Sequence, residues 1–124
     1  MSTEIRYLDL DLSSLESVRK CAADFVAQEP RLDILYLSAG IIRVAPGVTV
    51  EDYEIHFGIN YLGHTLLIRL LVPTMLHTTQ RQPDVRIVIV SSEGHVIAPK
   101  GGIDFNNLKT DGADIVSYSP LVSG

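Results

Sequence analysis

The sequence has little of what marks several large classes of protein. It contains a single cysteine, Cys21, so no disulfide can form within the chain. Its 10 lysines and arginines are scattered and are outnumbered by 15 acidic residues, for a net charge of -5. Nucleic-acid-binding proteins instead present a basic face to the phosphates. The longest apolar stretch, residues 61–72, is interrupted by His64 and Arg69 and is shorter than the ~20 residues that span a bilayer. We therefore expect no nucleic-acid partner and no membrane segment in this chain.

Signals for metal binding and for export are also missing. The 4 histidines do not show the paired spacing with cysteines or carboxylates that metal sites need, so no metal is expected. The first four residues do not resemble a signal peptide, and the lone thiol lies on an apolar stripe. These features favour a reducing, cytoplasmic location. A membrane anchor outside this sequence remains open.

What is present is a chain of 124 residues with a globular composition, 46% hydrophobic and 20% charged. Three segments have the pattern of strands. Residues 5–12 alternate between apolar and polar side chains, whereas residues 32–37 and 86–91 are mostly apolar and suit a buried parallel sheet.

Helical spacing of apolar residues separates the predicted strands. Ser13 and Glu16 form a plausible capping box for a first helix that ends before Pro30. A second helix is predicted from Thr49 or Asp52 to about residue 77, with a kink near residue 73, which is a proline. The alternation of strands and helices predicts an α/β fold with a parallel sheet and right-handed crossovers.

Small and polar residues follow each predicted strand. They are Asp11, then Ser38, Ala39 and Gly40, then the pair at residues 91–92. In open α/β sheets, ligands bind beyond the carboxyl ends of the strands, and small residues let a ligand approach the backbone. Taken singly, these residues are equally typical of ordinary turns.

Taken together, five features resemble the short-chain dehydrogenase/reductase family in order and spacing. They are the segments LDLDLSSLESVR, DILYLSAG, INYLGHTLL and RIVIVSSEGH, followed by Tyr118. The likeness is closest to the retinol-dehydrogenase-like and WW-domain-oxidoreductase-like branch, and SSEGHVIAPKGGIDFNNL is similar to its fungal members. The resemblance implies that residues 1–118 are an incomplete NAD(P)-binding Rossmann-type domain. Such an internal fragment would carry the third to fifth strands of a doubly wound sheet, and residues 119–124 depart from the family pattern.

The resemblance also implies a role for individual residues at the cofactor site. Asp11 matches the acidic residue that binds the adenine amino group, although a carboxylate at the start of a helix has a structural explanation too. Ala39 and Gly40 match the end of the Asn-Asn-Ala-Gly motif beside the cofactor. Leu37 and Ser38 replace the two asparagines of that motif, so the usual bracing contacts are in question.

Three further positions match catalytic residues of the family. Asn60 corresponds to the asparagine that holds a helix kink and a water in the proton relay. Ser92 corresponds to the serine whose hydroxyl donates to the substrate oxygen. Tyr118 corresponds to the acid/base, placed there by its spacing after the serine motif. The lysine that follows four residues after this tyrosine in the family is replaced by Val122.

The resemblance implies an NAD(P)-dependent oxidoreductase that interconverts a carbonyl and an alcohol on a small molecule, with a tailoring step in secondary metabolism as one role. The branch slightly favours NADP over NAD, and a homo-oligomer is open for a full-length relative. No glycine-rich phosphate-binding turn occurs in the sequence, so we expect the isolated chain to be inactive. The alternative is a truncated non-catalytic relative, or a fragmentary gene model, that acts, if at all, by protein association.

Overall fold

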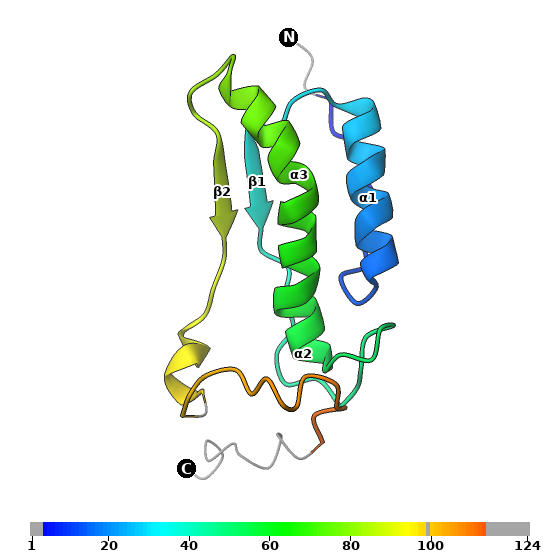
Figure 1. Ribbon diagram of the computed structural model, residues 1–124, viewed down its shortest axis with the longest axis vertical. Coiled ribbons are helices and arrows are strands. Elements are labelled where there is room, and N and C mark those ends of the chain that lie inside the picture. The colour runs from blue at the N-terminus through cyan, green and yellow to red at the C-terminus, as the bar shows by residue number, and fades with distance from the viewer. Residues whose placement is uncertain (1–3, 99, 114–124) are drawn as a thin grey trace.

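The structure is a computed structural model that describes residues 4–98 and 100–113. In chain order, its main elements are helix α1 (Leu15–Gln28), strand β1 (Ile34–Leu37), helix α2 (Ile55–Phe57), a π-helical segment (Gly58–Gly63), helix α3 (His64–Thr79) and strand β2 (Arg86–Ile89). A short 3-10 segment, Glu93–Ile97, follows β2. Figure 1 shows α3 lying between α1 and the two strands.

The two strands form a parallel sheet in which Ile34 pairs with Arg86 and Leu37 with Ile89. The N–H of Val90 extends the pairing by donating to the carbonyl of Leu37 at 2.9 Å. A parallel pair joined through a helix confirms the predicted α/β fold class.

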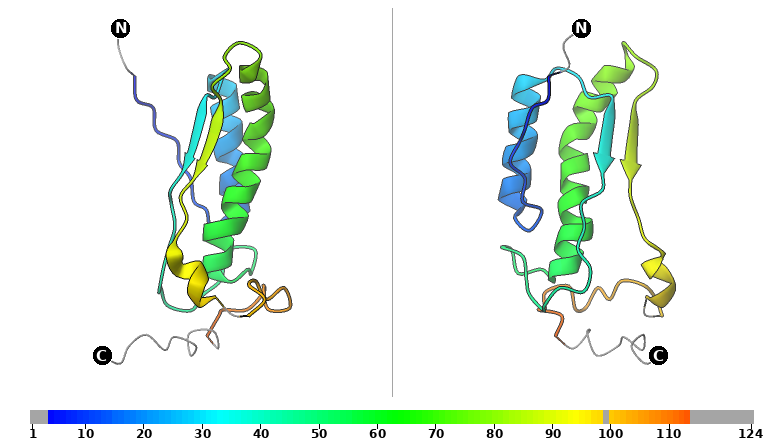
Figure 2. Two further views of the ribbon diagram at one scale, coloured as in Figure 1. Left: turned by 90° about the vertical axis from the view of Figure 1, so that its left-hand side faces the viewer. Right: turned by 180° about the vertical axis from the view of Figure 1, so that it is seen from behind.

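The helices cover one face of this sheet, as the edge-on view in Figure 2 shows. Side chains alternate along β1, so Leu37 is buried beneath the helices while Ile34 and Tyr36 are 52% and 63% exposed on the opposite face. The described residues therefore provide one of the two helical layers of a doubly wound fold.

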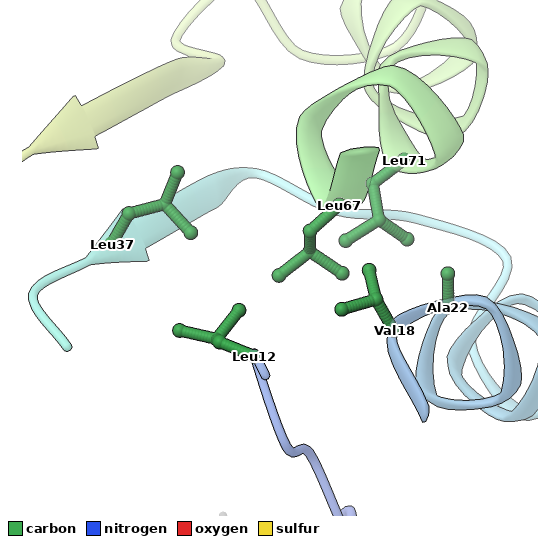
Figure 3. Packing of buried hydrophobic residues seen from close by; sticks show 6 residues of the cluster. All are labelled: Leu12, Val18, Ala22, Leu37, Leu67 and Leu71. Atoms are coloured by element: carbon green, nitrogen blue, oxygen red, sulfur yellow. The ribbon is translucent and has the colours of Figure 1, made fainter. Parts of the chain in front are cut away.

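The core lies between α1, α3 and β1 and includes Leu12 from the N-terminal segment. Figure 3 shows the six side chains of this cluster pointing toward one another: Leu12, Val18, Ala22, Leu37, Leu67 and Leu71. Val18 is fully buried on the apolar stripe of α1. Full burial of a leucine or valine side chain stabilises a fold by about 1.5–3 kcal/mol, so these contacts fix α3 against α1.

The predicted strand at residues 5–12 is wrong. Residues 4–10 are extended but, within the described part of the chain, make no backbone–backbone hydrogen bond. A strand needs a partner, and a groove of about 640 Å³ lies between the start of this segment and the amino end of β1. In the family's sheet order, two further strands would separate this segment from β1.

The predicted helix boundaries also shift. The cap of α1 is Ser14, one residue later than expected, and its side chain accepts a hydrogen bond from the N–H of Ser17. The second helix begins at Ile55 with Glu54 as its cap, because residues 48–54 form a turn in which Asp52 has a positive φ of 63°. The helix continues through Pro73, and its irregular turn lies at Gly58–Gly63 instead.

The combined helical stretch Ile55–Thr79 is long and apolar enough to cross a membrane by length and composition, with a mean hydropathy of 1.2 over an 18-residue window. One such helix is weak support for a membrane span, because core helices of soluble proteins meet the same criteria. In this fold Leu67, Leu71 and Met75 from α3 are buried against the rest of the chain.

Candidate functional site

The Asn60 side chain holds the backbone of the loop that follows β1. Its Oδ1 accepts a hydrogen bond from the Ile41 N–H at 2.8 Å, and its Nδ2 donates to the Ile41 carbonyl at 2.9 Å. Gly40 lies so close that an added Cβ would sit 3.2 Å from Asn60 Oδ1. The structure thus brings Gly40 and Asn60, which are far apart in the sequence, into contact.

Asn60 sits inside the π-helical segment Gly58–Gly63. A π turn is rare and is frequent at functional sites, and asparagine is unfavourable within helices. The two hydrogen bonds to Ile41 explain why an asparagine occurs at this helical position.

His64 is a contact residue that the sequence patterns did not identify. It begins α3, is only 9% exposed, and its Nε2 lies 2.8 Å from the carbonyl oxygen of Ala39. The signal was its position four residues after Asn60, because residues i and i+4 share a helix face. Asn60 and His64 therefore both hold the loop at residues 39–41, Asn60 at Ile41 and His64 at Ala39.

Ser92 follows β2 and caps the 3-10 segment. Its Oγ accepts a hydrogen bond from the Gly94 N–H at 3.1 Å. Because a hydroxyl has one donor proton and two acceptor lone pairs, this contact uses the oxygen and leaves the proton for another acceptor. Ser92 is exposed, so its hydroxyl is accessible to a small molecule. The neighbouring His95 turns back, with Nδ1 3.1 Å from the Ser92 carbonyl.

Asp11 lies in the turn before α1 and is exposed. Its Oδ1 accepts hydrogen bonds from both the N–H and the hydroxyl of Ser13, at 2.9 and 2.6 Å. The Ser13 hydroxyl and N–H together lower the pKa of Asp11 below its ordinary value. Both contacts fall on the same oxygen, so Oδ2 is left for an outside donor.

Leu37, one of the two residues in place of family asparagines, is part of the core cluster with 5% exposure. The side chain packs against the helices, where an asparagine amide would need polar partners. Ser38 is exposed. At this point apolar packing replaces the bracing contacts that the family asparagines would make.

Residues 108–112 lie against the turn that precedes α2. The Glu54 N–H donates to the Leu108 carbonyl at 2.8 Å, and the Gly47 N–H donates to the Asp111 carbonyl at 2.9 Å. Burial opposes ionisation of the Glu54 carboxyl, but the N–H groups of His56 and Phe57, together with the His56 side chain, outweigh it and lower the pKa of Glu54 below its ordinary value. This carboxylate therefore stabilises the turn beside the site.

Two of the predicted site residues, Gly40 and Asn60, meet beyond the carboxyl end of β1. The 39–40 turn follows β1 and touches Asn60, and Ser92 follows β2 at the same edge. Asp11 directly precedes Leu12, which packs in the core. The part of the chain that the structure describes contains no group of three metal-ligating side chains. Tyr118 lies outside the described residues, so its position stays a prediction.

Comparisons with known proteins identify related sequences and a related fold. The family model for short chain dehydrogenase matches residues 1–103. An uncharacterized oxidoreductase of Schizosaccharomyces pombe is 43% identical over 86% of this chain and 32% of its own length. A short-chain dehydrogenase/reductase of Emericella nidulans is 41% identical over 82% of this chain and 33% of its own length.

Human retinol dehydrogenase 13 is 40% identical over 80% of this chain and 28% of its own length. The chain thus spans about a third of the length of the curated relatives it matches. Among solved structures, an uncharacterized protein from Mycobacterium paratuberculosis has a similar fold, with a TM-score of 0.61 and 33% identity over 81% of this chain and 32% of that chain.

Proposed function

This chain belongs to the short-chain dehydrogenase/reductase family, an oxidoreductase family. From that membership we propose that it forms the catalytic middle of an NAD(P)-dependent enzyme that interconverts a carbonyl and an alcohol. The observation that carries this proposal is the Asn60 amide, which holds Ile41 by both backbone groups beside the small residues Ala39 and Gly40.

The residues present fit one side of a dinucleotide. Ala39 and Gly40 are exposed, and their small side chains leave the backbone open to a bulky ligand. Asp11 is exposed and ionised at neutral pH, since its pKa is lowered, and Oδ2 can accept a hydrogen bond from an amino group. We assign the adenine end to Asp11 and the neighbouring part of the cofactor to the turn at residues 39–40. The branch resembled favours NADP over NAD.

The chain's own contribution to chemistry would centre on Ser92. When bound, the cofactor supplies or accepts the hydride. The Ser92 hydroxyl, oriented by the Gly94 N–H, can donate a hydrogen bond to the substrate oxygen as negative charge develops there, which stabilises the transition state. Tyr118 would exchange the proton with that oxygen. A carbonyl or alcohol of a small organic molecule is the substrate class, and a tailoring role in secondary metabolism stays a prediction.

A chimera provides the test, because no glycine-rich phosphate turn occurs in this sequence. The segment of the Schizosaccharomyces pombe oxidoreductase that matches this chain would be replaced by the corresponding residues of this chain. Binding of NADPH and NADH is then followed by the emission of the reduced nicotinamide, and turnover is measured with a panel of ketones and aldehydes.

The expected result is saturable binding with NADPH preferred, and carbonyl reduction that falls by about 10²–10³-fold in Ser92→Ala. Ser91→Ala is the matched control and should keep most of the activity. A folded chimera that binds NADPH but shows no turnover, or one whose turnover is unaffected by Ser92→Ala, would refute the catalytic assignment. The 124-residue chain on its own should show no turnover.

A further inference from the structure

The His64 imidazole occupies a defined and unusual environment. His64 is the first residue of α3 and is 9% exposed. It follows the buried Gly63 and precedes the core residue Leu67 by three positions. Its Nε2 lies 2.8 Å from the carbonyl oxygen of Ala39, 25 positions earlier in the sequence. A buried polar side chain with one long-range hydrogen bond ties the start of the helix to the loop after β1.

The contact fixes the tautomer of the ring. A carbonyl oxygen can only accept, so Nε2 must carry the proton and donate it. The other nitrogen, Nδ1, is then a bare acceptor, and it is buried without a hydrogen-bond partner among the described residues. A single long-range bond therefore specifies both the orientation of the ring and the position of the Ala39 carbonyl.

Asn60 adds a second anchor to the same loop. It lies one turn before His64 and binds both backbone groups of Ile41. The two side chains thus hold the residues on either side of Gly40, whose backbone is left between two fixed points. Gly40 in turn approaches Asn60 so closely that an added Cβ would lie 3.2 Å from Oδ1.

We propose that His64 is a positioning residue that fixes the turn at residues 39–41 by donating from Nε2 to the Ala39 carbonyl. The consequence of this hydrogen bond for catalysis rests on the proposed function, because the dinucleotide would lie beside residues 39–41. Asn60 holds one side of the turn and His64 the other, so the turn is preorganised before any ligand binds, which lowers the cost of ordering it on binding.

The first measurement is the protonation of the His64 ring in the full 124-residue chain, read from its nitrogen resonances by NMR. Nε2 should carry the proton in a single tautomer, with Nδ1 bare. A ring protonated on Nδ1, or a mixture of tautomers like that of a free imidazole, would overturn the proposal. This measurement requires no variant, and it stands even where a substitution prevents folding.

The second measurement is hydrogen exchange of the Ile41 amide in His64→Leu and His64→Gln. Leucine cannot donate to the Ala39 carbonyl, so the loop at residues 39–41 should open more easily. The Ile41 amide, although still bonded to Asn60, should then exchange about fivefold faster, the effect of one ordinary hydrogen bond. Glutamine can place an amide donor near the position of Nε2 and should restore the rate to within about twofold. The Val90 amide, which donates to Leu37 in the sheet, is the internal control and should not change.

Exposed His77 in the last turn of α3 provides the matched variant. His77→Leu should leave both amides at their original rates. Equal acceleration of Ile41 and Val90 in His64→Leu, no acceleration at Ile41, or failure of His64→Gln to restore the rate would each overturn the proposal. Neither measurement uses a dinucleotide or a substrate, so failure of the proposed function would leave these results unaffected.

Discussion

Replacing Gly63 by alanine tests the contact that joins the N-terminal segment to the long helix. Gly63 has helical angles, φ −61° and ψ −45°, so its conformation does not require glycine. By helix propensity alone, alanine should stabilise this position by about 1 kcal/mol. An added Cβ would, however, lie 2.7 Å from the Leu12 carbonyl oxygen and 3.2 Å from Leu12 Cβ.

The clash should decide whether Gly63→Ala raises or lowers the stability of the fold. The carbonyl belongs to the backbone, and the Leu12 side chain is anchored in the core with 8% exposure. Neither can move away without disturbing the packing, and overpacking of this kind costs about 1–3 kcal/mol. Subtracting the propensity gain leaves a net loss of up to about 2 kcal/mol. For a chain of this size, a loss of about 1 kcal/mol, the middle of that range, lowers the unfolding midpoint by about 3–6 °C.

The assay is thermal and urea unfolding of the wild-type chain and Gly63→Ala, followed by circular dichroism. Gly47→Ala is the control, since the nearest neighbour of its added Cβ would be the Ala45 carbonyl at an ordinary 3.9 Å. A Gly63→Ala chain as stable as the wild type, or more stable, would show that helix propensity dominates. That result would refute the close approach of Leu12 to Gly63.

Three further outcomes are expected. The lowered pKa of Glu54 means that its carboxylate stabilises the folded chain above its ordinary pKa of 4.5 and that this stability is lost as the pH falls through the lower folded value. Urea midpoints should therefore decrease more steeply below about pH 4.5 in the wild type than in Glu54→Gln, and parallel curves would contradict this. Asn60→Ala should lower the free energy of unfolding by about 1–3 kcal/mol through loss of both bonds to Ile41, and Asn60→Asp, which sets a carboxylate oxygen against the Ile41 carbonyl, should lose at least as much in the same assay. Leu37→Asn, which introduces the family residue, should cost at least about 2 kcal/mol because it buries an amide in the apolar core, and an unchanged midpoint would refute that placement.

The strongest sequence patterns predicted the fold correctly where local signals and tertiary contacts agree. The apolar runs around Ile34–Leu37 and Arg86–Ile89 are strands because each finds the other as a parallel partner. The stripe on α1 became a buried helix face through Val18 and Ala22. Residues 5–12 carried an equally plausible strand pattern, but strand formation depends on a pairing partner that a local pattern cannot reveal.

The site was predictable at the level of residue positions and less so at the level of contacts. The segment around Asn60 and the small residues after β1 pointed to the same edge of the sheet, and they meet there. The hydrogen bond from His64 to Ala39 was not predicted, because the sequence signal for His64, its position four residues after Asn60, does not identify the partner. Ser92 follows β2 as expected, whereas Asp11 follows a segment that is not a strand; the roles of both toward cofactor and substrate stay predictions, as does Tyr118.

The irregular turn at Gly58–Gly63 sets the rotational phase of everything that follows it. A π turn takes up an extra residue compared with an α-helical one, and each residue of an α-helix advances by about 100°. In a regular α-helix the extra residue would rotate α3 by that angle and move Leu67 and Leu71 off the face that packs on α1, whereas the wider turn keeps them on it. The extra residue thus lets one continuous helix present Asn60 to the loop after β1 and, farther along, its leucines to the core.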